Sequence, residues 1–436
     1  MTSISPDVTI ETAKAPSARH RIMAGFIGNV IEWYDFALYG YLAGVLAPVF
    51  FPTDDPAAGL IATYGIFAAG FLMRPLGAAI FGFFGDRYGR ARAMQVSVTM
   101  MVLPTLALGL LPSYAQVGIL APILLVVVRL VQGLSVGGEF SSSVTWLVET
   151  APQGKRGLVG SWANIGSMTG SLLGVGAASL VTTFCEPDLL LDWGWRLPFL
   201  AGALMGLLAI WIRRNLHESK RFEQHHENRS DTSPLLQAFT TNRHETLLAL
   251  GFAAGYGACF YIVFVYLPQW LTETNLLDRA TALTLNTAMT LFIIPLMPLF
   301  AIVGDRWISR RSWILIALSV LSLSAWPLYL WMQHSDGSLF SILMTHVILF
   351  SLMAVPLGSG PALFVEMFPE EDRLSGYSIA FNVGLGIFGG LTPMINSSLI
   401  ATTGTNMIPA YYTVLMAAAA VLILSFTPDR SRAPLR

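Results

Sequence analysis

Long apolar runs alternate with short polar segments along almost the whole chain. Each run is about twenty residues or longer, which is the length that an α-helix needs to cross the hydrocarbon core of a bilayer. The first run follows a polar N-terminus and lacks a small-residue cleavage pattern, so we expect it to be retained as a span. The pattern predicts an all-α protein with twelve transmembrane helices, at 22–50, 58–84, 93–111, 117–148, 158–184, 196–213, 246–272, 280–303, 312–332, 340–368, 376–402 and 408–427.

Composition supports this interpretation and narrows the chemistry. Of the 436 residues, 54% are hydrophobic and only 12% are charged, against roughly 25% charged in soluble domains. Two cysteines, Cys185 and Cys259, fall in a loop and inside a span, so we expect no disulfide framework. The sequence contains no recognisable phosphate-binding loop, metal cluster or nucleophile–histidine pair. We therefore expect no enzyme, no cofactor, no metal and no nucleic-acid partner.

Positive charges set the expected orientation. With the N-terminus inside the cell, all but four of the 25 Lys and Arg residues lie in cytoplasmic segments. The exceptions are Arg196 and Arg279 in outer loops and Arg74 and Arg129 within spans. This asymmetry predicts that both termini are cytoplasmic. The longest polar segment divides the spans six and six, which predicts an N-terminal tail (1–20), two six-helix bundles (21–213 and 246–427), a cytoplasmic linker (214–245) and a short C-terminal tail (428–436).

The two halves repeat each other. A Gly-Asp-Arg sequence at 85–87, after span two, recurs at 304–306, after span eight. The pair Glu149 and Arg156, at the end of span four, recurs 217 residues later at the end of span ten. A parallel repeat of two bundles suits rocking about a central site, which is alternating access.

These motifs resemble the major facilitator superfamily over essentially the whole length. Residues 82–90 (GFFGDRYGR) are similar to its loop motif between spans two and three, and residues 129–133 (RLVQG) to its span-four motif. Residues 28–36 (GNVIEWYDF), 137–140 (GGEF) and 388–393 (FGGLTP) resemble its metabolite:proton symporter branch. The resemblance implies a multi-pass transporter of the bacterial inner membrane that imports proline, betaine, 2-oxoglutarate, citrate, shikimate or a similar compound with protons.

Two departures from related patterns narrow this. Span five, over 164–176, has the glycines but not the proline of the antiporter motif, which disfavours a drug antiporter. The segment after Phe426 has no heptads, so we expect no coiled-coil extension of the kind found in some osmosensory members.

Five ionisable residues fall within the predicted spans of the first half: Glu32, Asp35, Arg74, Arg129 and Glu139. A charge in the hydrocarbon layer is unfavourable by several kcal/mol unless it is paired or hydrated, so such residues are functional candidates. Counting 1.5 Å per residue from the helix ends predicts two layers, Glu32/Arg74/Glu139 and Asp35/Arg129. Three carboxylates against two guanidiniums would leave one negative charge uncompensated.

The odd carboxylate predicts proton coupling. Arginine keeps its proton, so the carboxylate with the weaker Arg contact is the expected carrier. We favour Asp35, paired with Arg129, with Glu32 as the alternative and Glu139 in the same network. Protonation would weaken the Arg contact and allow an anionic substrate to occupy that Arg. The alternative is a static network that only holds the first bundle together.

The substrate cavity is expected to lie between the halves. The second half has no charge deep in a span except His346, which we interpret as a hydrogen-bonded packing residue. Uncharged polar groups would then line that side. The predicted substrate-binding residues are Arg74, Arg129, Tyr39, Tyr256, Tyr261, Gln269, Asn286 and Asn382.

The repeated loop motifs predict an inner gate. A carboxylate there can meet a helix N-terminus or a guanidinium of the other half, and repeated opening requires that such contacts be modest. The alternative, that these charges only set topology, does not explain the repeated Gly-Asp-Arg. The predicted gate residues are Asp86, Arg87, Arg90, Glu149, Arg156, Asp305, Glu366 and Arg373.

The favoured hypothesis is a proton-coupled importer of a small organic acid, a di- or tricarboxylate, driven by the proton gradient and acting as a monomer in the bilayer. An anion is preferred because two buried Arg residues offer its carboxylate a bidentate site. The alternatives are a proline/betaine-type zwitterion symporter and an exporter or exchanger of small metabolites. A non-transporting sensor is disfavoured, because the longest polar segment is only about thirty residues long.

Overall fold

The computed structural model describes residues 18–53, 55–214, 216, 218, 233–335 and 337–435. The described residues form helices and no strand. The predicted N-terminal tail up to residue 17 and half of the predicted linker lie outside the described residues. Within the linker, the described part includes the short helix α11 (Pro234–Phe239).

The first half contains six spans. Span two is divided at Met73, because Pro75 at the start of α3 cannot donate the backbone hydrogen bond that would continue α2. The long helices of the first half are α1 (Ala18–Phe50), α2 (Pro56–Leu72), α3 (Arg74–Tyr88), α4 (Arg90–Leu110), α6 (Leu120–Glu149), α7 (Arg156–Phe184) and α9 (Arg196–Arg213). The loops of this half contain α5 (Tyr114–Val117), α8 (Pro187–Leu189) and the π-helical turn η1 (Leu190–Gly194).

The second half also contains six spans, and two of them include π-helical segments. Span seven passes through η2 and span eleven through η3, which starts at Asn382. The elements are α12 (Arg243–Tyr261), η2 (Ile262–Tyr266), α13 (Leu267–Glu273), α14 (Arg279–Arg306), α15 (Arg310–Gln333), α16 (Leu339–Met367), α17 (Arg373–Phe381), η3 (Asn382–Gly389), α18 (Thr392–Thr403) and α19 (Ile408–Ser425).

The predicted twelve-helix fold is confirmed. Eleven helical segments among the described residues are long and apolar enough to cross a membrane. The twelfth span is α1, which has 33 residues and is less apolar because it carries Glu32 and Asp35. Each helix begins and ends within a few residues of the predicted span.

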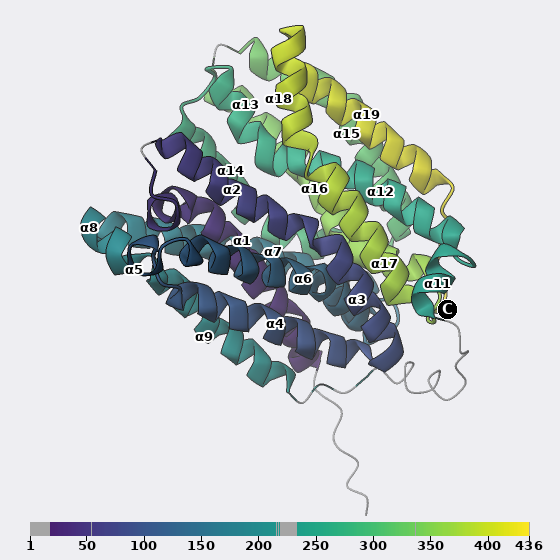
Figure 1. Cartoon of the computed structure of the whole chain (residues 1–436). Helices are drawn as coiled ribbons and strands as arrows, with labels where there is room; N and C mark the ends of the chain where they lie inside the picture. Colours follow the sequence, from purple (N-terminus) through teal and green to yellow (C-terminus); the bar gives the residue numbers. More distant parts are fainter. Residues whose placement is uncertain are drawn as a thin grey trace, which may run out of the picture.

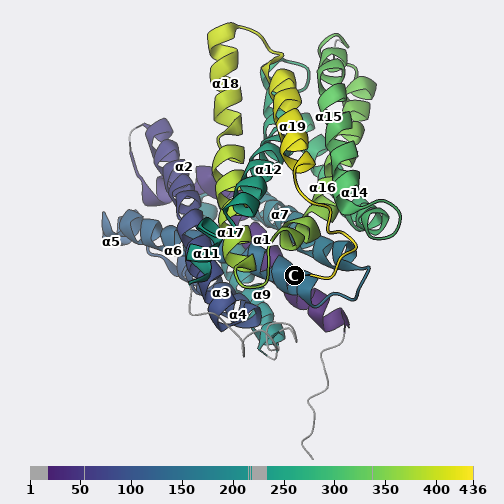
Figure 2. The same cartoon turned by 90° about the vertical axis from the view of Figure 1, so that its right-hand side faces the viewer.

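The two halves form two separate blocks of helices. Figure 1 shows the first-half helices, purple to teal, below the second-half helices, green to yellow, and Figure 2 shows the same separation from the side. Within the first half α1 packs along α7, and a Cβ at Gly170 would lie 2.1 Å from the Val30 carbonyl oxygen. Only glycine permits such an approach of two helix backbones. Between the halves, α3 packs on α17, and α7 packs on α14 and α16.

The two ends of the molecule differ in how closely the halves approach. We call the end that carries the loop motifs 82–90 and 304–311 the motif end, and the opposite end the far end. At the far end, a cavity of about 600 Å³ lies between α7 and α14, and its lining includes Tyr41, Ser179 and Thr284. At the motif end, hydrogen bonds join the same two helices. The structure is therefore closed at the motif end and more open at the far end.

Candidate functional site: buried charges and the motif end

Asp35 and Arg129 form a direct ion pair, as their predicted depths indicated. Arg129 Nη1 lies 2.8 Å from Asp35 Oδ2, and both side chains are almost fully buried. Gln132 Nε2 donates to the same oxygen at 2.9 Å, and Thr105 Oγ1 donates to Oδ1 at 3.1 Å. The Asp35 carboxylate therefore has three donors around it, and each of them favours its charged form.

Aromatic rings surround the Arg129 guanidinium. The Tyr39 ring centroid lies 3.9 Å from Arg129 Cζ, and the Phe36 and Phe67 centroids each lie 5.6 Å away. The Tyr39 hydroxyl donates to the Thr63 carbonyl oxygen at 3.1 Å. Tyr39, predicted to bind substrate, is thus placed where it holds Arg129 by a cation–π contact.

Glu32 has a much weaker partner. Arg74 Nη2 lies 3.7 Å from Glu32 Oε1, beyond hydrogen-bonding distance. Neither carboxylate oxygen accepts a hydrogen bond from the described residues, although only 1% of the residue is exposed. A buried carboxylate without hydrogen bonds is strongly unfavourable when charged.

Arg74 instead points toward the second half. Its Nε donates to Asn382 Oδ1 at 3.3 Å. The Phe71 and Phe36 ring centroids lie 5.3 and 5.9 Å from Arg74 Cζ. Arg74 therefore lies at the junction of α2 and α3, between a carboxylate of its own half and an amide of the other.

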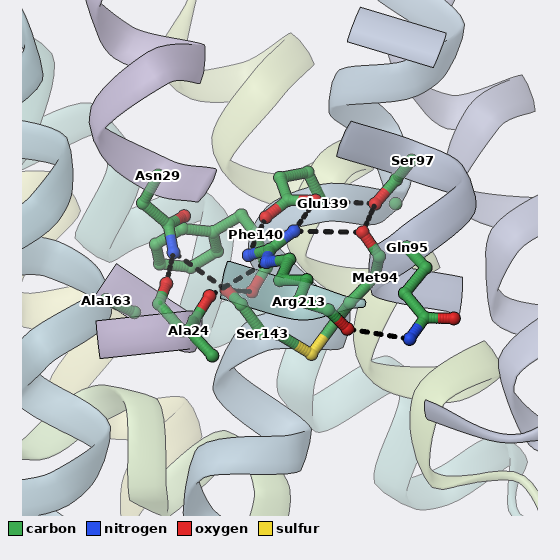
Figure 3. A network of polar contacts seen from close by, with 12 residues as sticks. Ala24, Asn29, Met94, Gln95, Ser97, Glu139, Phe140, Ser143, Ala163 and Arg213 are labelled. Atoms are coloured by element: carbon green, nitrogen blue, oxygen red, sulfur yellow. Dashed lines mark hydrogen bonds and ion pairs between the residues drawn. The ribbon is translucent and has the colours of Figure 1, made fainter. Parts of the chain in front are cut away.

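Glu139 has a partner that depth counting did not predict. Its carboxylate forms a bidentate pair with Arg213, at 2.6 Å from Nη2 to Oε1 and 2.9 Å from Nη1 to Oε2. Figure 3 shows the Arg213 guanidinium within this network, where Ser97 also donates to Glu139. Arg213 further donates to the carbonyl oxygens of Ala24 and Met94. Every donor nitrogen of Arg213 has an acceptor, so this pair is a built part of the first bundle.

The charge count changes with this pairing. Arg213, the last residue of the predicted span six, is fully buried. The buried cluster then consists of three carboxylates and three guanidiniums, paired as Glu32/Arg74, Asp35/Arg129 and Glu139/Arg213. The prediction of one uncompensated negative charge is wrong. What distinguishes the carboxylates is how many hydrogen bonds each accepts.

The second-half candidates are more dispersed than predicted. Gln269 is exposed and donates to Glu273 at 2.7 Å, and Asn286 donates to the Phe264 carbonyl oxygen at 3.2 Å. Tyr256 stacks on Phe252 within an aromatic cluster between the halves.

Among these candidates, Asn382 is bonded to Arg74. Tyr261 lies close enough to Arg74 for an electrostatic interaction. His346 is buried, with Nδ1 2.8 Å from the Ile342 carbonyl oxygen, which matches a packing role.

At the motif end, each half caps a helix of the other. Asp86 accepts hydrogen bonds from the backbone amides of Leu374 at 3.1 Å and Ser375 at 2.7 Å, in the first turn of α17. Asp305 accepts from the amides of Gly157 and Leu158, both at 2.9 Å, in the first turn of α7. The Gly-Asp-Arg repeat thus places a carboxylate at a helix N-terminus twice, where the helix dipole favours it.

Ion pairs reinforce both caps. Glu149 lies 2.6 Å from Arg373 Nη1 and 3.4 Å from Arg90 Nε. The related Glu366 pairs with Arg156 at 3.3 Å and with Arg310.

The predicted gate set omitted Arg310, which lies four residues after the second Gly-Asp-Arg. Arg310 also binds Asp305 at 2.5 Å. Arg87 is exposed on α3. Contacts with one another or with the opposite half are made by Asp86, Arg90, Glu149, Arg156, Asp305, Glu366 and Arg373.

Two further contacts lie beside the caps. Arg156 Nη1 donates to the Ala433 carbonyl oxygen at 2.8 Å, so the C-terminal segment covers this cluster. Asp372, just before α17, is buried, which raises the pKa of its carboxyl from an ordinary 3.8 to about 7. A hydrogen bond from Asn242 at 2.9 Å opposes that rise.

This combination of a duplicated helical bundle, a buried charge cluster and paired helix caps defines a secondary transporter. Residues 21–247 match the family described as Sugar (and other) transporter, and residues 259–436 match the Major Facilitator Superfamily. The chain belongs to the major facilitator superfamily and is a transporter rather than an enzyme.

Its relatives are transporters of bacteria. The glycine betaine/proline/ectoine/pipecolic acid transporter OusA of Dickeya dadantii (strain 3937) is 33% identical over 431 residues, which cover 96% of this chain and 85% of the relative. The proline/betaine transporter of Escherichia coli (strain K12) is 32% identical over 430 residues, with the same coverage of both chains. The chain is a multi-pass protein of a bacterial inner membrane.

A solved structure shows the same fold. The proton:xylose symporter XylE bound to 6-bromo-6-deoxy-D-glucose superimposes with a TM-score of 0.76 over 96% of this chain and 97% of that one. The two sequences are 16% identical, so the likeness concerns the fold alone.

Proposed function

We propose that this transporter takes up a small zwitterion of the betaine or proline type together with a proton, from the far end to the motif end. The observation that carries the proposal is the neutral buried cluster of three carboxylates and three arginines. A di- or tricarboxylate would bring uncompensated negative charge into this low-dielectric region, which is strongly unfavourable. A zwitterion adds no net charge, and the relatives described above are named for such compounds.

This replaces our favoured organic acid. That hypothesis required two arginines free to hold a substrate carboxylate. The structure engages Arg129 with Asp35 at 2.8 Å. Arg74 is the one buried guanidinium of the cluster whose carboxylate partner lies beyond hydrogen-bonding distance. One available guanidinium suits a monocarboxylate better than a di- or tricarboxylate.

Aromatic rings supply a place for the positive end of the substrate. Phe36, Phe67 and Phe71 pack edge to face beside Arg74 and Arg129, with centroids 4.9 to 5.7 Å apart. Ring faces attract cations, quaternary ammonium groups included. A substrate carboxylate on Arg74 would place an ammonium group near these rings and near the open oxygens of Glu32.

Glu32 is the proton carrier in this proposal, in place of Asp35. Three donors stabilise the charged form of Asp35, whereas the Glu32 carboxylate accepts no hydrogen bond from the described residues. Protonated Glu32 leaves the Arg74 guanidinium to the substrate carboxylate. Ionised Glu32 competes for that guanidinium, which couples the two ligands through one cation.

The orientation and the assembly state complete the proposal. The Lys and Arg bias supports an orientation with the motif end and both termini in the cytoplasm. Asp86 and Asp305 then act as latches of the inner gate, which is closed in this structure. The charge cluster lies within one chain, so a monomer suffices for transport.

Uptake into proteoliposomes tests the function. Labelled glycine betaine and proline should accumulate when an inward proton gradient is imposed, and a protonophore should abolish the accumulation. Citrate and 2-oxoglutarate serve as comparison substrates. Accumulation of these acids but not of the zwitterions, or uptake that is insensitive to the gradient, would overturn the proposal.

The proton site is tested by two matched variants. Glu32→Gln should lose accumulation against a gradient but keep counterflow exchange, because exchange needs no net proton movement. Asp35→Asn should weaken both, because it removes the charge that holds Arg129 in place. Glu186→Gln, in an exposed loop, is the control. Unchanged accumulation by Glu32→Gln would assign the proton elsewhere.

A further inference from the structure

We infer that Asn382 is a positioning residue that holds Arg74 away from Glu32 while the motif end is closed, and releases Arg74 when that end opens. Release of the proton from Glu32 would then be tied to the movement of the halves. This inference rests on the proposed role of Glu32 as proton carrier. It concerns a side chain of the second half acting on a charge pair of the first.

Asn382 joins three elements at the centre of the molecule. It is the first residue of η3, directly after α17, and only 3% of it is exposed. Its Oδ1 accepts from Arg74 Nε at 3.3 Å. Its Nδ2 donates to the Gly137 carbonyl oxygen of α6 at 3.0 Å and to the Ser378 carbonyl oxygen of α17 at 2.9 Å. Two of these three hydrogen bonds cross between the halves.

The Glu32/Arg74 pair is looser than the other pairs of the cluster. Arg213 and Arg129 approach their carboxylates to 2.6 and 2.8 Å. Arg74 remains 3.7 Å from Glu32, while its Nε is engaged by Asn382. The long separation therefore accompanies a hydrogen bond that turns the guanidinium toward the second half.

Opening of the motif end must break the Asn382 contacts. Asp86 binds the start of α17 at Leu374 and Ser375, two turns before Asn382 on the same helix. When α17 leaves α3, it carries Asn382 away from Arg74 and from Gly137. Arg74 then loses its amide acceptor, and the carboxylate it faces is Glu32. Closer approach of the guanidinium favours the ionised carboxylate, so the proton leaves toward the motif end.

Three charged groups act electrostatically on Glu32, namely Arg74, Glu139 and Arg213, and Asp35 lies one turn further along α1. Only the contacts of Arg74 change when the halves separate. Glu139 and Arg213 pair with each other inside the first half, as do Asp35 and Arg129. Arg74 is the member of the cluster that is bonded to the second half among the described contacts. It alone can convert movement of the halves into a change at Glu32.

Substitutions at Asn382 test the inference through the pH dependence of uptake. Asn382→Ala frees Arg74 in the closed state, so half-maximal uptake should require an external pH about one unit more acidic. Asn382→Asp holds Arg74 more firmly and should shift the profile in the opposite direction. Asn396→Ala is the matched control, because Asn396 is buried in the same span and donates to Thr392 of its own helix.

Two further measurements separate this inference from the proposed function. In a Glu32→Gln background, Asn382→Ala should produce no additional pH shift. Counterflow exchange and the melting temperature show whether each variant is folded and binds substrate. The inference is overturned if folded Asn382→Ala and Asn382→Asp keep the parental profile while Glu32→Gln abolishes proton dependence. If Glu32→Gln leaves proton coupling intact, the role of Glu32 fails first, and the inference with it.

Discussion

Replacing Asp86 with Asn should shift the motif end from its closed form toward an open one. The carboxylate accepts two backbone hydrogen bonds from α17 and lies 3.2 Å from Arg90. Asparagine has the same size but only one acceptor oxygen and no charge. At least one charge-assisted hydrogen bond is lost, which corresponds to about 1.5–3 kcal/mol. The ratio of closed to open molecules should fall by about ten- to a hundredfold.

The second cap still holds the motif end closed when Asp86 alone is substituted. Asp305 binds α7 with partners of its own, Gly157, Leu158 and Arg310. Because the two caps share no partner, their contributions should add. Asp305→Asn should behave like Asp86→Asn. In the double variant, the ratio of closed to open molecules should fall by the product of the two single-variant factors.

Distances between spin labels measure this equilibrium directly. Suitable sites are Tyr88 and Trp307, which are 47% and 70% exposed at the motif end of opposite halves. The native Cys185 and Cys259 would first be replaced by alanine. The label-to-label distance should lengthen in each variant, in a larger fraction of molecules for the double variant. Unchanged distances together with a lowered melting temperature would show that the caps stabilise the fold without controlling closure.

Three other predictions concern stability in detergent, read from melting temperatures. Gly28→Ala should destabilise by about 1–3 kcal/mol, because its Cβ would lie 2.0 Å from Glu139 Oε1 and 2.1 Å from Arg213 Nη2; Gly40→Ala, whose Cβ would meet no neighbour within 4 Å, should have no such effect. Glu139→Leu alone should destabilise by about 3–5 kcal/mol, and adding Arg213→Met should restore most of the loss, whereas an equally unstable double variant would contradict the pairing. Because burial raises the pKa of Asp372 to about 7 from 3.8, the folded state holds a proton there that the unfolded chain releases. Stability should therefore fall as the pH rises from about 4 to 7, and Asp372→Asn should flatten that dependence.

Much of the fold can be predicted from the sequence because the bilayer imposes a length on each apolar run. The Asp35/Arg129 pair follows from the same reasoning, since two charges counted to equal depth in neighbouring spans have few other partners. The repeat likewise indicates where carboxylates such as Asp86 and Asp305 gather. These features depend on one coordinate, the depth along the membrane normal.

Arg213 shows where depth alone fails. It is the last residue of α9, so its backbone lies near the edge of the bundle. Its long side chain reaches inward to Glu139 and to the backbone of α1, which begins at Ala18, earlier than predicted. A second arginine follows at Arg214, which could have indicated that the two face different surroundings.

The contact between Arg74 and Asn382 was also beyond prediction. It depends on the break before α3, on the start of a π-helical segment, and on which end of the transporter is closed. None of these appears in hydropathy. Asn382 was correctly expected between the halves, but its partner depends on conformation.

The equal number of buried acids and arginines has an electrical consequence for a carrier of this kind. With Glu32 ionised and no substrate, the three ion pairs sum to zero charge. The empty carrier would then reorient without moving charge across the membrane. Loaded with one proton and a zwitterion, it would move one positive charge, so a potential of 100 mV contributes about 2.3 kcal/mol to that step alone. Transport currents should therefore report on the loaded carrier, and voltage should leave the return of the empty one unaffected.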